Sequence, residues 1–532
     1  MASAYSSDAA YPPAIDDAEC RRLIQAIKDW SIAKGLTVRP PPAAVSATET
    51  ELASTLAMTA PVTLFPSPFP RSCFIEAQGA QQAYNELYAM ISQDEAFLSR
   101  IVAEVAGGDD FTTQLWGVHE RVKAEGYTHK HSLGIFRSDY LVHQETTESG
   151  REHLQIKQVE FNTIAASFGG LSGQTSELHK FLAKTEYPLL QASSKIATAI
   201  GYSLPDNTSS KGIAAGLEAA FEVYNRSETT HNDLPRCIVF LVQDGERNVF
   251  DQRHIEYAID APVFRVPFSR ILQQTSVDAS SPRRRLLYHH LCASGSARGT
   301  AGTIFEVAVV YMRAGYGPSD YPDESAWEAR YQVERSSAIK CPTVLTQVAG
   351  TKKVQQVLAT PSEATTSELG RFVADADRQA TLRRTFANIY PLDTSSAAGR
   401  QAREWAQDPA ACRKFVLKPQ REGGGNNYYK DKIPAHLQTV PTEHWASYIL
   451  MELITPPPVV NLILRNGQIE QGGVICELGI YGTCIWSNGD GASNNSILRN
   501  EAAGYLLRTK GDQSEEGGVA AGFGCMDSVN LV

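Results

Sequence analysis

The chain has 532 residues, of which 42% are hydrophobic and 20% are charged, an ordinary composition for a globular protein. This length favours more than one structural unit, each able to bury a core. A formal net charge of −10 argues against nucleic-acid binding, which normally needs a basic face, and no apolar run is long enough to span a bilayer.

Residues 1–8 have neither the basic start nor the apolar core of a signal peptide, so the sequence predicts a cytoplasmic protein. The nine cysteines are scattered and show no Cys-x-x-Cys spacing, a pattern typical of free thiols in a reducing compartment. The twelve histidines are also dispersed and lack the spacing of zinc ligands.

Several segments indicate organisation rather than chemistry. The acidic pair Asp16–Asp17 precedes an amphipathic run and predicts an acid-capped helix. Residues 39–70, rich in proline and alanine, predict a loop-heavy passage, and residues 80–106 return to helical periodicity. Turn residues at both ends of 205–235 mark a boundary around one short helix. The basic cluster Arg283–Arg285 predicts a solvated helix start, with a local anion site as the alternative.

The segment 156–164 predicts a strand with candidate metal ligands. On a strand Glu160 and Asn162 point to the same face, because side chains alternate with a period of two. A carboxylate and an amide oxygen side by side are hard ligands of the kind that Mg2+ prefers. The alternative is a solvent-facing strand edge. A glycine-containing loop, residues 167–171, follows next to this pair.

Two continuous apolar runs, residues 237–242 and 305–311, predict strands buried on both faces, with enough sequence between them for crossover helices. We interpret residues 235–342 as an inserted α/β unit. Arg313 follows the second strand, at the end where ligands of open α/β sheets gather. Arg313 and Arg137 are each a candidate clamp for a substrate carboxylate, or a structural ion pair.

The most informative segment is 418–429. It follows a short apolar strand and contains three consecutive glycines, which let backbone N–H groups turn toward a bound anion. Lys418 adds a positive charge, and Glu422 beside the glycines is placed to hold a metal. The combination favours a site for phosphate and a divalent cation over a flexible surface turn.

Three C-terminal features extend this pattern. Glu477 lies inside an apolar strand, where a carboxylate needs a cation or hydrogen-bond donors nearby. Met451 and Glu452 end an apolar run that provides a wall for an adenine, or plain core packing. Arg508 and Lys510 precede a glycine- and alanine-rich loop that could close over an anionic substrate.

Common catalytic motifs are missing from the sequence. It has no Gly-x4-Gly-Lys-Ser/Thr, no Gly-x-Gly-x-x-Gly opening a helix, no Gly-x-Ser-x-Gly and no His-Glu-x-x-His. No Ser/His/Asp or Cys/His grouping emerges either. These absences fit phosphoryl activation, in which cations and positioned amides do most of the catalysis.

Taken together, these residues resemble the eukaryotic glutathione synthetases, a family of ATP-grasp ligases. The blocks that carry the resemblance run in the expected order from Arg137 to the C-terminal region, and the chain before Arg137 matches less distinctly. They are residues 159–170, 246–252, 349–356, 418–427, 450–452, 477–479, 507–510 and 517–521.

The resemblance implies an α/β fold, a circularly permuted ATP-grasp with an inserted α/β substrate-binding domain and a lid, usually in a homodimer. The implied parts are an N-terminal part of the ATP-grasp body, the inserted domain, and a C-terminal part of the body that includes a glycine-rich lid and an alanine-rich loop. Their ranges are 1–234, 235–342, 343–532, about 390–465 and about 511–524.

The implied reaction is ligation of γ-glutamylcysteine and glycine to glutathione, with ATP as co-substrate and Mg2+ as cofactor, through an acyl phosphate. The implied metal ligands are Glu160, Asn162 and Glu422. The implied ATP site is Lys352, Lys418, Gly423, Gly424, Gly425, Asn427, Tyr429, Met451, Glu452, Glu477 and Lys510. The implied substrate site is Arg137, Ser167, Asn248, Gln252, Arg313, Tyr316, Arg508, Val519 and Ala520. Arg137, Lys352, Lys418 and Arg508 are the implied catalytic residues.

The sequence departs from the family pattern at two places. Ala165 stands where the family often has serine, which removes one hydroxyl contact to the dipeptide, and residues 286–303 are longer than usual. Two alternatives stay open. One is the same ligase chemistry with β-alanine or serine as the amine acceptor, and the other is a non-catalytic regulator that binds ATP.

Overall fold

The computed structural model describes most of the chain, with gaps. The described residues are 11–41, 56–146, 152–185, 187, 202–227, 234–280, 282–290, 303–360, 368–488, 496–515 and 524–532. Val519 and Ala520, most of the alanine-rich loop and most of the long segment at 286–303 lie outside them.

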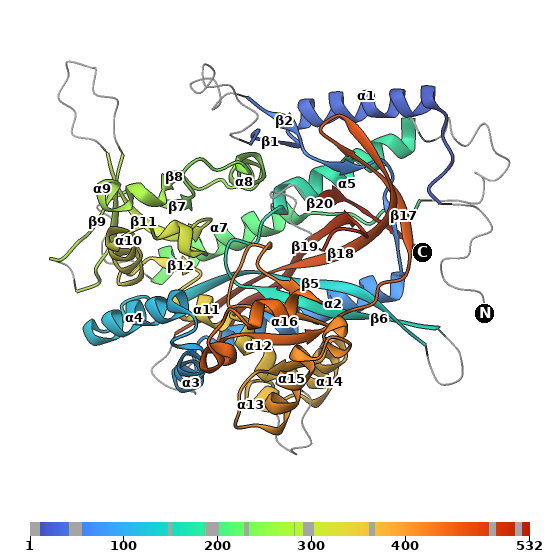
Figure 1. Cartoon of the computed structure of the whole chain (residues 1–532). Coiled ribbons are helices and arrows are strands. Elements are labelled where there is room, and N and C mark those ends of the chain that lie inside the picture. The colour runs from blue at the N-terminus through green and yellow to red at the C-terminus, as the bar shows by residue number, and fades with distance from the viewer. Residues whose placement is uncertain are drawn as a thin grey trace.

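The fold is mixed α/β and contains several sheets (Figure 1). The largest described sheet has the order β17-β3-β20-β19-β18-β5-β6 and passes through the middle of the molecule. Its strands are β17 (Val459–Arg465), β3 (Val62–Thr63), β20 (Gly524–Asp527), β19 (Ile497–Gly511), β18 (Gln468–Ser487), β5 (His131–Thr146) and β6 (Glu152–Asn162).

A second sheet has the order β8-β7-β11-β10-β9, with β12 also paired to β11. Its strands are β8 (Val263–Pro267), β7 (Arg236–Val242), β11 (Ile304–Met312), β10 (Leu286–His289), β9 (Thr275–Val277) and β12 (Ile339–Cys341). The prediction of two buried strands here is confirmed, because β7 and β11 run parallel and are almost wholly buried.

A third, smaller sheet has the order β13-β16-β14-β15, and two strand pairs complete the β structure. The third sheet consists of β13 (Ile389–Pro391), β16 (Ile449–Glu452), β14 (Phe415–Lys418) and β15 (Tyr428–Tyr429). The pairs are β1 (Thr37–Val38) with β2 (Met58–Thr59) and β4 (Ser67–Phe69) with β21 (Val529–Leu531).

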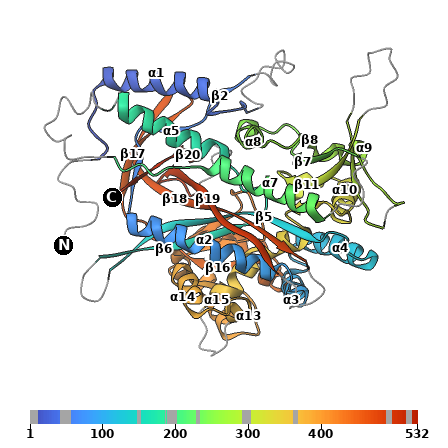
Figure 2. The same cartoon turned by 180° about the vertical axis from the view of Figure 1, so that it is seen from behind.

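Helices cover both faces of the central sheet (Figure 2). A Cβ on Gly482 of β18 would meet Asn85 of α2, whereas the next residue, Thr483, contacts Gly216 of α7. Neighbouring strand residues point to opposite faces, so α2 and α7 lie on opposite faces. The N-terminal helices are α1 (Asp17–Lys34), α2 (Arg71–Ile91), α3 (Glu95–Val105), α4 (Asp110–Glu125), α5 (Gly169–Thr185) and α7 (Ser209–Ser227).

The remaining helices follow α7 along the chain. They are α8 (Val249–Glu256), α9 (Ile271–Gln274), α10 (Glu324–Glu334), α11 (Val344–Ala349), α12 (Lys352–Ala359), α13 (Glu368–Phe372), α14 (Ala376–Thr385), α15 (Ala397–Gln407) and α16 (Lys432–Leu437). Short 3₁₀ turns occupy Phe268–Arg270, Pro318–Asp320, Ala411–Lys414 and Thr442–Ser447.

The N-terminal expectations are confirmed. Asp16 caps α1 by accepting hydrogen bonds from the backbone N–H groups of Ala18 and Glu19, and the Glu19 carboxylate accepts from the Asp16 N–H in return. This reciprocal capping satisfies donors that the first helical turn leaves open. The passage at 39–70 contains short strands between loops, and its residues 42–55 lie outside the described part.

The predicted helix start at Arg283–Arg285 is wrong. These residues lie in a turn before β10, where Arg283 reaches the Glu306 carboxylate at 3.2 Å and Arg285 reaches Asp278 at 3.0 Å. Arg284 pairs with Glu125. Glu306 is fully buried in β11, and a buried carboxylate needs cationic partners. The three arginines therefore form ion pairs with acids elsewhere in the fold and do not begin a helix.

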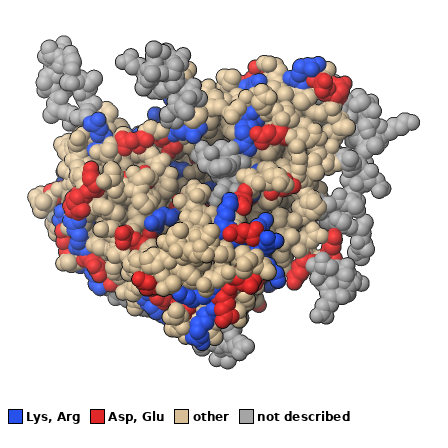
Figure 3. Space-filling view, viewed as in Figure 1, with Lys and Arg blue, Asp and Glu red and all other residues tan. Residues whose placement is uncertain are grey.

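None of the described helices has the length and apolar character needed to cross a lipid bilayer. On the face shown in Figure 3, acidic and basic side chains are interspersed over the described surface, without a broad basic patch.

Distant parts of the chain meet around β3, which lies inside the central sheet. Strand β3 lies between β17 and β20, with Thr63 opposite Ile463 and Val62 opposite Met526. The Asp527 carboxylate joins the strands and loops of this region. It accepts hydrogen bonds from the hydroxyls of Thr63 at 2.7 Å, Ser67 at 2.6 Å and Thr509 at 2.7 Å.

Asp527 predicts a pH-dependent contribution to stability. Burial raises the pKa of its carboxyl group to about 6, although the hydroxyl donors act in the opposite direction. Between the pKa of the unfolded chain and pH 6, the folded state retains a proton that the unfolded state has lost. This contribution therefore weakens as the pH rises through that range. Lowering the pH from 7 to 5 should stabilise the wild type relative to Asp527→Asn by about 1 kcal/mol.

The measurement is the melting temperature of wild type and Asp527→Asn across this pH range. On acidification from pH 7 to pH 5, the melting temperature of the wild type should rise by about 1–2 °C relative to that of Asp527→Asn. A difference that does not change with pH would contradict the assignment.

Candidate active site

The largest concentration of predicted site residues surrounds a cleft of about 550 Å³ between the central sheet, the third sheet and α12. The implied residues that line it are Arg137, Glu160, Asn162, Ser167, Tyr316, Lys352, Lys418, Glu422, Gly423, Gly424, Asn427, Tyr429, Met451, Glu452, Glu477, Arg508 and Lys510. Residues from all parts of the described chain beyond Arg137 thus converge on one cavity.

Strand register brings the central residues side by side on one face of the sheet. In β5 and β6, Arg137 lies opposite Asn162 and Asp139 lies opposite Glu160. Phe161, between the two β6 residues, points the other way and stacks on Tyr88 of α2 with ring centroids 3.9 Å apart. Glu160 and Asn162 therefore face away from α2, as the alternation of strand side chains predicts.

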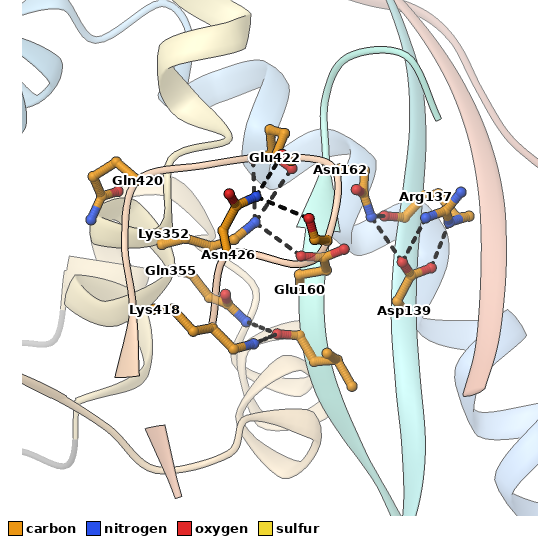
Figure 4. Close-up of polar contacts among 12 residues, drawn as sticks. Arg137, Asp139, Glu160, Asn162, Lys352, Gln355, Lys418, Gln420, Glu422 and Asn426 are labelled. Carbon is orange, nitrogen blue, oxygen red and sulfur yellow. Dashed lines mark hydrogen bonds and ion pairs between the residues drawn. The ribbon is translucent and has the colours of Figure 1, made fainter. Parts of the chain in front are cut away.

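Lys352, the first residue of α12, lies between two carboxylates (Figure 4). Its Nζ is 3.0 Å from Glu160 Oε2, and 3.3 and 3.4 Å from the two oxygens of Glu422. Only 4% of the lysine side chain is exposed, against 24% for Glu160 and 21% for Glu422. A β6 acid and a loop acid are thus gathered around one positive charge.

In this arrangement the pKa values of Glu160 and Glu422 shift in opposite directions. Burial opposes ionisation of Glu160, but Lys352, Lys418 and Arg508 outweigh it and lower its pKa. Burial raises the pKa of Glu422 to about 7, and the charge of Glu160 adds to this effect while Lys352 opposes it. Two carboxylates that share a site behave in this way, and a bound cation would favour the ionised form of both.

The glycine loop connects β14 to β15 at the edge of the cleft. Gly423, Gly424 and Gly425 have φ values of +94°, +66° and +79°, a backbone conformation that favours glycine. The start of the loop is fixed by Gln420, whose Oε1 accepts from the Lys353 N–H at 2.9 Å and whose Nε2 donates to the Ser447 carbonyl at 2.8 Å. The loop therefore extends from an anchored base.

The donor set fits a magnesium ion. Asn162 uses its Nδ2 to donate to Asp139 Oδ2 at 3.0 Å and to the Arg137 carbonyl at 3.2 Å, and no hydrogen bond to its Oδ1 is found within the described residues. With the carboxylates of Glu160 and Glu422 this gives hard oxygen ligands around one cleft. No group of three or more His, Cys, Asp or Glu side chains that could hold a metal is found within the described residues. The candidate set here has two carboxylates and one amide oxygen.

The far end of the cleft is the candidate adenine pocket. Met451 is 2% exposed and contributes an apolar wall from β16. Glu452 follows it and accepts hydrogen bonds from Asn388 Nδ2 at 2.9 Å and from the Tyr390 hydroxyl at 3.2 Å. Lys418 lies at the end of β14 and donates to the Val159 carbonyl at 3.0 Å, which joins β14 to β6.

At the opposite end, the loop at 164–170 is held by buried charged residues. Arg313 donates to Ser167 Oγ at 2.9 Å and to the Ala166 carbonyl at 3.0 Å, and Arg137 donates to the Ser167 carbonyl at 3.0 Å. The Asp251 carboxylate accepts from the N–H groups of Phe168, Gly170 and Leu171. These contacts maintain a backbone in which Ala165 and Phe168 have φ values of +49° and +71°, which is uncommon for residues other than glycine.

Not every implied residue lines the cleft. Asn248 and Gln252 lie in and beside α8, where Asn248 donates to Asp251 and Gln252 donates to Glu246. Arg313 acts on the loop at 164–170 rather than on the cavity, and Gly425 also lies off the lining. Val519 and Ala520 are outside the described residues.

The sequence argument missed two buried acids, Asp139 and Asp251. The sequence pattern could have indicated Asp139, because it lies two residues from Arg137 on a strand and so shares its face. Asp251 was included in a matching block but had no apparent role until the three N–H groups of the loop were seen to converge on it.

Gly479 provides a test of this geometry. It lies opposite Asp139 in the β18–β5 ladder, and a Cβ there would be 2.7 Å from Asp139 Oδ1 and 2.8 Å from Arg137 Cδ. Gly479→Ala should displace the pair and lower kcat/KM about tenfold or more, since a small misplacement of a positioned group is costly.

The matched control is Gly472→Ala in the same strand, where a Cβ would meet nothing within 4 Å. Steady-state kinetics of both variants decide the question. Equal kinetics of the two variants would show that the space at Gly479 has no functional importance.

Comparison with known proteins identifies the family. Residues 17–531 match the family model described as the ATP-binding domain of eukaryotic glutathione synthase. The chain is 37% identical to the glutathione synthetase of Homo sapiens over 521 residues, which covers 96% of this chain and 97% of the relative. It is 37% identical to the glutathione synthetase large chain of Schizosaccharomyces pombe over 485 residues, covering 88% and 91%.

A solved structure supports the fold. The glutathione synthetase-like effector of Globodera pallida, in its apo form, aligns with a TM-score of 0.68 over 98% of this chain and 100% of that chain, at 19% sequence identity. This mixed α/β chain thus has sequence relatives along nearly its whole length. The chain belongs to the eukaryotic glutathione synthase family.

Proposed function

We propose that this protein is a glutathione synthase, which uses ATP and Mg2+ to join γ-glutamylcysteine to glycine. The observation that carries the proposal is the convergence of Glu160, Glu422 and Lys352 in one cleft, with Asn162 beside them. Family membership and the length of the matches support the choice of reaction.

We also propose that the fold is a circularly permuted ATP-grasp. In this proposal residues 1–234 and 343–532 form its body, and 235–342 form an inserted substrate domain that contains the second sheet. Residues of about 390–465 carry the glycine-rich lid, and about 511–524 form an alanine-rich loop over the acceptor. The order of the sheets along the chain supports this division.

In the proposed mechanism, positive charges offset the negative charge of the phosphates while a phosphoryl group is transferred. Mg2+ bound by Glu160, Asn162 and Glu422 would offset the charge of the ATP phosphates. Lys352 and Lys418 add fixed positive charges on either side, and the N–H groups of the glycine loop contact the phosphates. The dipeptide's cysteinyl carboxylate takes the γ-phosphoryl group to give an acyl phosphate, and ADP leaves.

The second step joins the amine. Arg508 holds the carboxylate of glycine, whose amine attacks the acyl carbon and releases inorganic phosphate. Arg137, with Ser167 and Tyr316 nearby in the lining, holds the dipeptide. Closure of the two loops would keep water from hydrolysing the acyl phosphate.

The decisive experiment measures ADP release with ATP, Mg2+ and γ-glutamylcysteine in the presence of glycine, β-alanine or serine. If the protein is a glutathione synthase, kcat/KM should be highest with glycine. Preference for β-alanine or serine would instead assign a related ligase, and background release with every amine would favour a regulator that only binds ATP.

The proposed setting is a cytoplasmic homodimer with small-molecule substrates. Free cysteines support the reducing compartment, because the described thiols at positions 20, 73, 237, 341, 412, 476, 484 and 525 form no disulfide. Sedimentation equilibrium of the purified protein would test the dimer.

A further inference from the structure

The Asp139 side chain lies beside Arg137 and Asn162 (Figure 4) and does not line the cleft itself. It is fully buried and accepts from Arg137 Nε at 2.6 Å and Arg137 Nη2 at 2.8 Å. Its Oδ2 also accepts from Asn162 Nδ2 at 3.0 Å and Arg508 Nη2 at 3.1 Å. One carboxylate therefore contacts a proposed metal ligand, Asn162, and the two arginines proposed to hold the substrate carboxylates, Arg137 and Arg508.

We propose that Asp139 is a positioning residue. It turns the amide of Asn162 so that the oxygen faces the metal, and it fixes the spacing of Arg137 and Arg508 for the two substrate carboxylates. The inference rests on the proposed function, because that function assigns the metal and the substrates to these three side chains.

The amide orientation follows from the chemistry of its neighbours. The two groups on one side of the Asn162 amide, Asp139 Oδ2 and the Arg137 carbonyl oxygen, only accept hydrogen bonds. Only the NH2 of an amide can satisfy them, since its oxygen would meet two further acceptors. With Nδ2 committed in this way, Oδ1 is left to face the cleft. Without the Asp139 charge, one of the two constraints on this orientation would be lost.

The arginine spacing follows from the same carboxylate. Arg137 is held by a two-point contact, which fixes the plane of its guanidinium as well as its position. Arg508 is held through Nη2 by Asp139 and by Glu477, which lies opposite it in the β18–β19 ladder. The two guanidinium groups, of Arg137 and Arg508, are thus held close together by hydrogen bonds to the Asp139 carboxylate.

Without its arginine and amide partners, a carboxylate at position 139 would destabilise the fold. Asp139 lies directly across the ladder from Glu160, and like charges directly opposite on a sheet are destabilising. Burial of an unpaired carboxylate would add to that cost. A residue that served packing alone would not need a charge at this position, and Gly479 is needed on the neighbouring strand to make room for it.

Asp139→Asn is the test, because asparagine keeps the shape but replaces one acceptor oxygen by a donor. We expect the variant to weaken Mg2+-dependent ATP binding and to raise the KM for γ-glutamylcysteine and for glycine, each about tenfold or more. Binding is measured by titration calorimetry of ATP over a range of Mg2+ concentrations. This readout needs neither acceptor nor turnover.

Glu306→Gln is the matched control. Glu306 is also a fully buried strand carboxylate held by arginines, but it lies in the second sheet and away from the cleft. It should lower the melting temperature while leaving the affinity for Mg2+·ATP and both KM values unchanged. If Asp139→Asn behaves in the same way, Asp139 is structural and the proposal is overturned.

A double variant separates the two roles. In Asp139→Asn/Asn162→Asp, residue 162 offers an oxygen to the metal in either orientation, whereas the two-point contact with Arg137 stays broken. The Mg2+ dependence of ATP binding should return toward the wild type, and the KM for γ-glutamylcysteine should stay raised. Failure of this double variant to restore the Mg2+ dependence would overturn the role at Asn162.

The two proposals fail differently in these assays. A wild-type protein that forms no peptide product contradicts the proposed function. The calorimetric comparison of Asp139→Asn with Glu306→Gln still decides the role of Asp139 in that case.

Discussion

Replacing Glu422 by glutamine is expected to lower kcat on the order of 10³-fold while leaving the fold intact. Glutamine has the same shape but cannot supply the negative charge that a magnesium ion needs. The carboxylate lies at the start of the glycine loop and is 21% exposed, so its change removes little packing. Its contact with Lys352 is a charge interaction that the cation would replace or share.

The measurement is the rate of ADP release at saturating ATP, dipeptide and glycine, together with the melting temperature. Glu404→Gln is the control, because Glu404 is an exposed acid on α15 in the same part of the chain. It should retain wild-type kcat. A Glu422→Gln variant with near-normal turnover would remove Glu422 from the metal site.

Replacing Lys352 by methionine is expected to have a comparable effect, about 10²–10³-fold on kcat. The lysine ammonium lies 3.0 Å from Glu160 and 3.3 Å from Glu422. Burial acts to lower its pKa, but the charges of Glu160 and Glu422 outweigh burial and raise it. Without it, the two acids repel one another and the phosphates lose a fixed positive charge. Binding of ATP should weaken as well.

Lys353→Met is the control on the next residue of the same helix. Lys353 is equally buried, but its Nζ pairs with Glu104 at 2.9 Å and does not line the cleft. We expect this variant to lose stability and to keep its kcat. Calorimetric titration with ATP and steady-state kinetics separate the two lysines, and equal kinetic losses in both variants would contradict the role given to Lys352.

Much of the site could be predicted because local patterns encode it. The same-face pair Glu160 and Asn162 follows from strand alternation, and the three glycines of 423–425 follow from the need for left-handed backbone, which they adopt. The strands at 237–242 and 305–311 were predicted by their apolar runs and are confirmed as β7 and β11.

The rest depends on contacts between distant segments. Lys352 and Glu422 are 70 positions apart, and the sequence does not show that Lys352 bridges Glu422 to Glu160. The arginines at 283–285 were misassigned for the same reason, since their partners Glu125 and Glu306 are remote in sequence. A short-range pattern cannot show which buried acid a cation will reach.

The pairing of β3 with β20 has a consequence for biosynthesis. Val62 in β3 pairs with Met526 in β20, so a ribosome must add almost the entire polypeptide before β3 gains this neighbour. At ordinary translation speed the wait is roughly half a minute to a minute and a half, during which an incomplete sheet edge is open to aggregation. We therefore expect the nascent chain to depend on chaperones until its last segment emerges, and nonsense mutations close to the C-terminus to be as damaging as early ones.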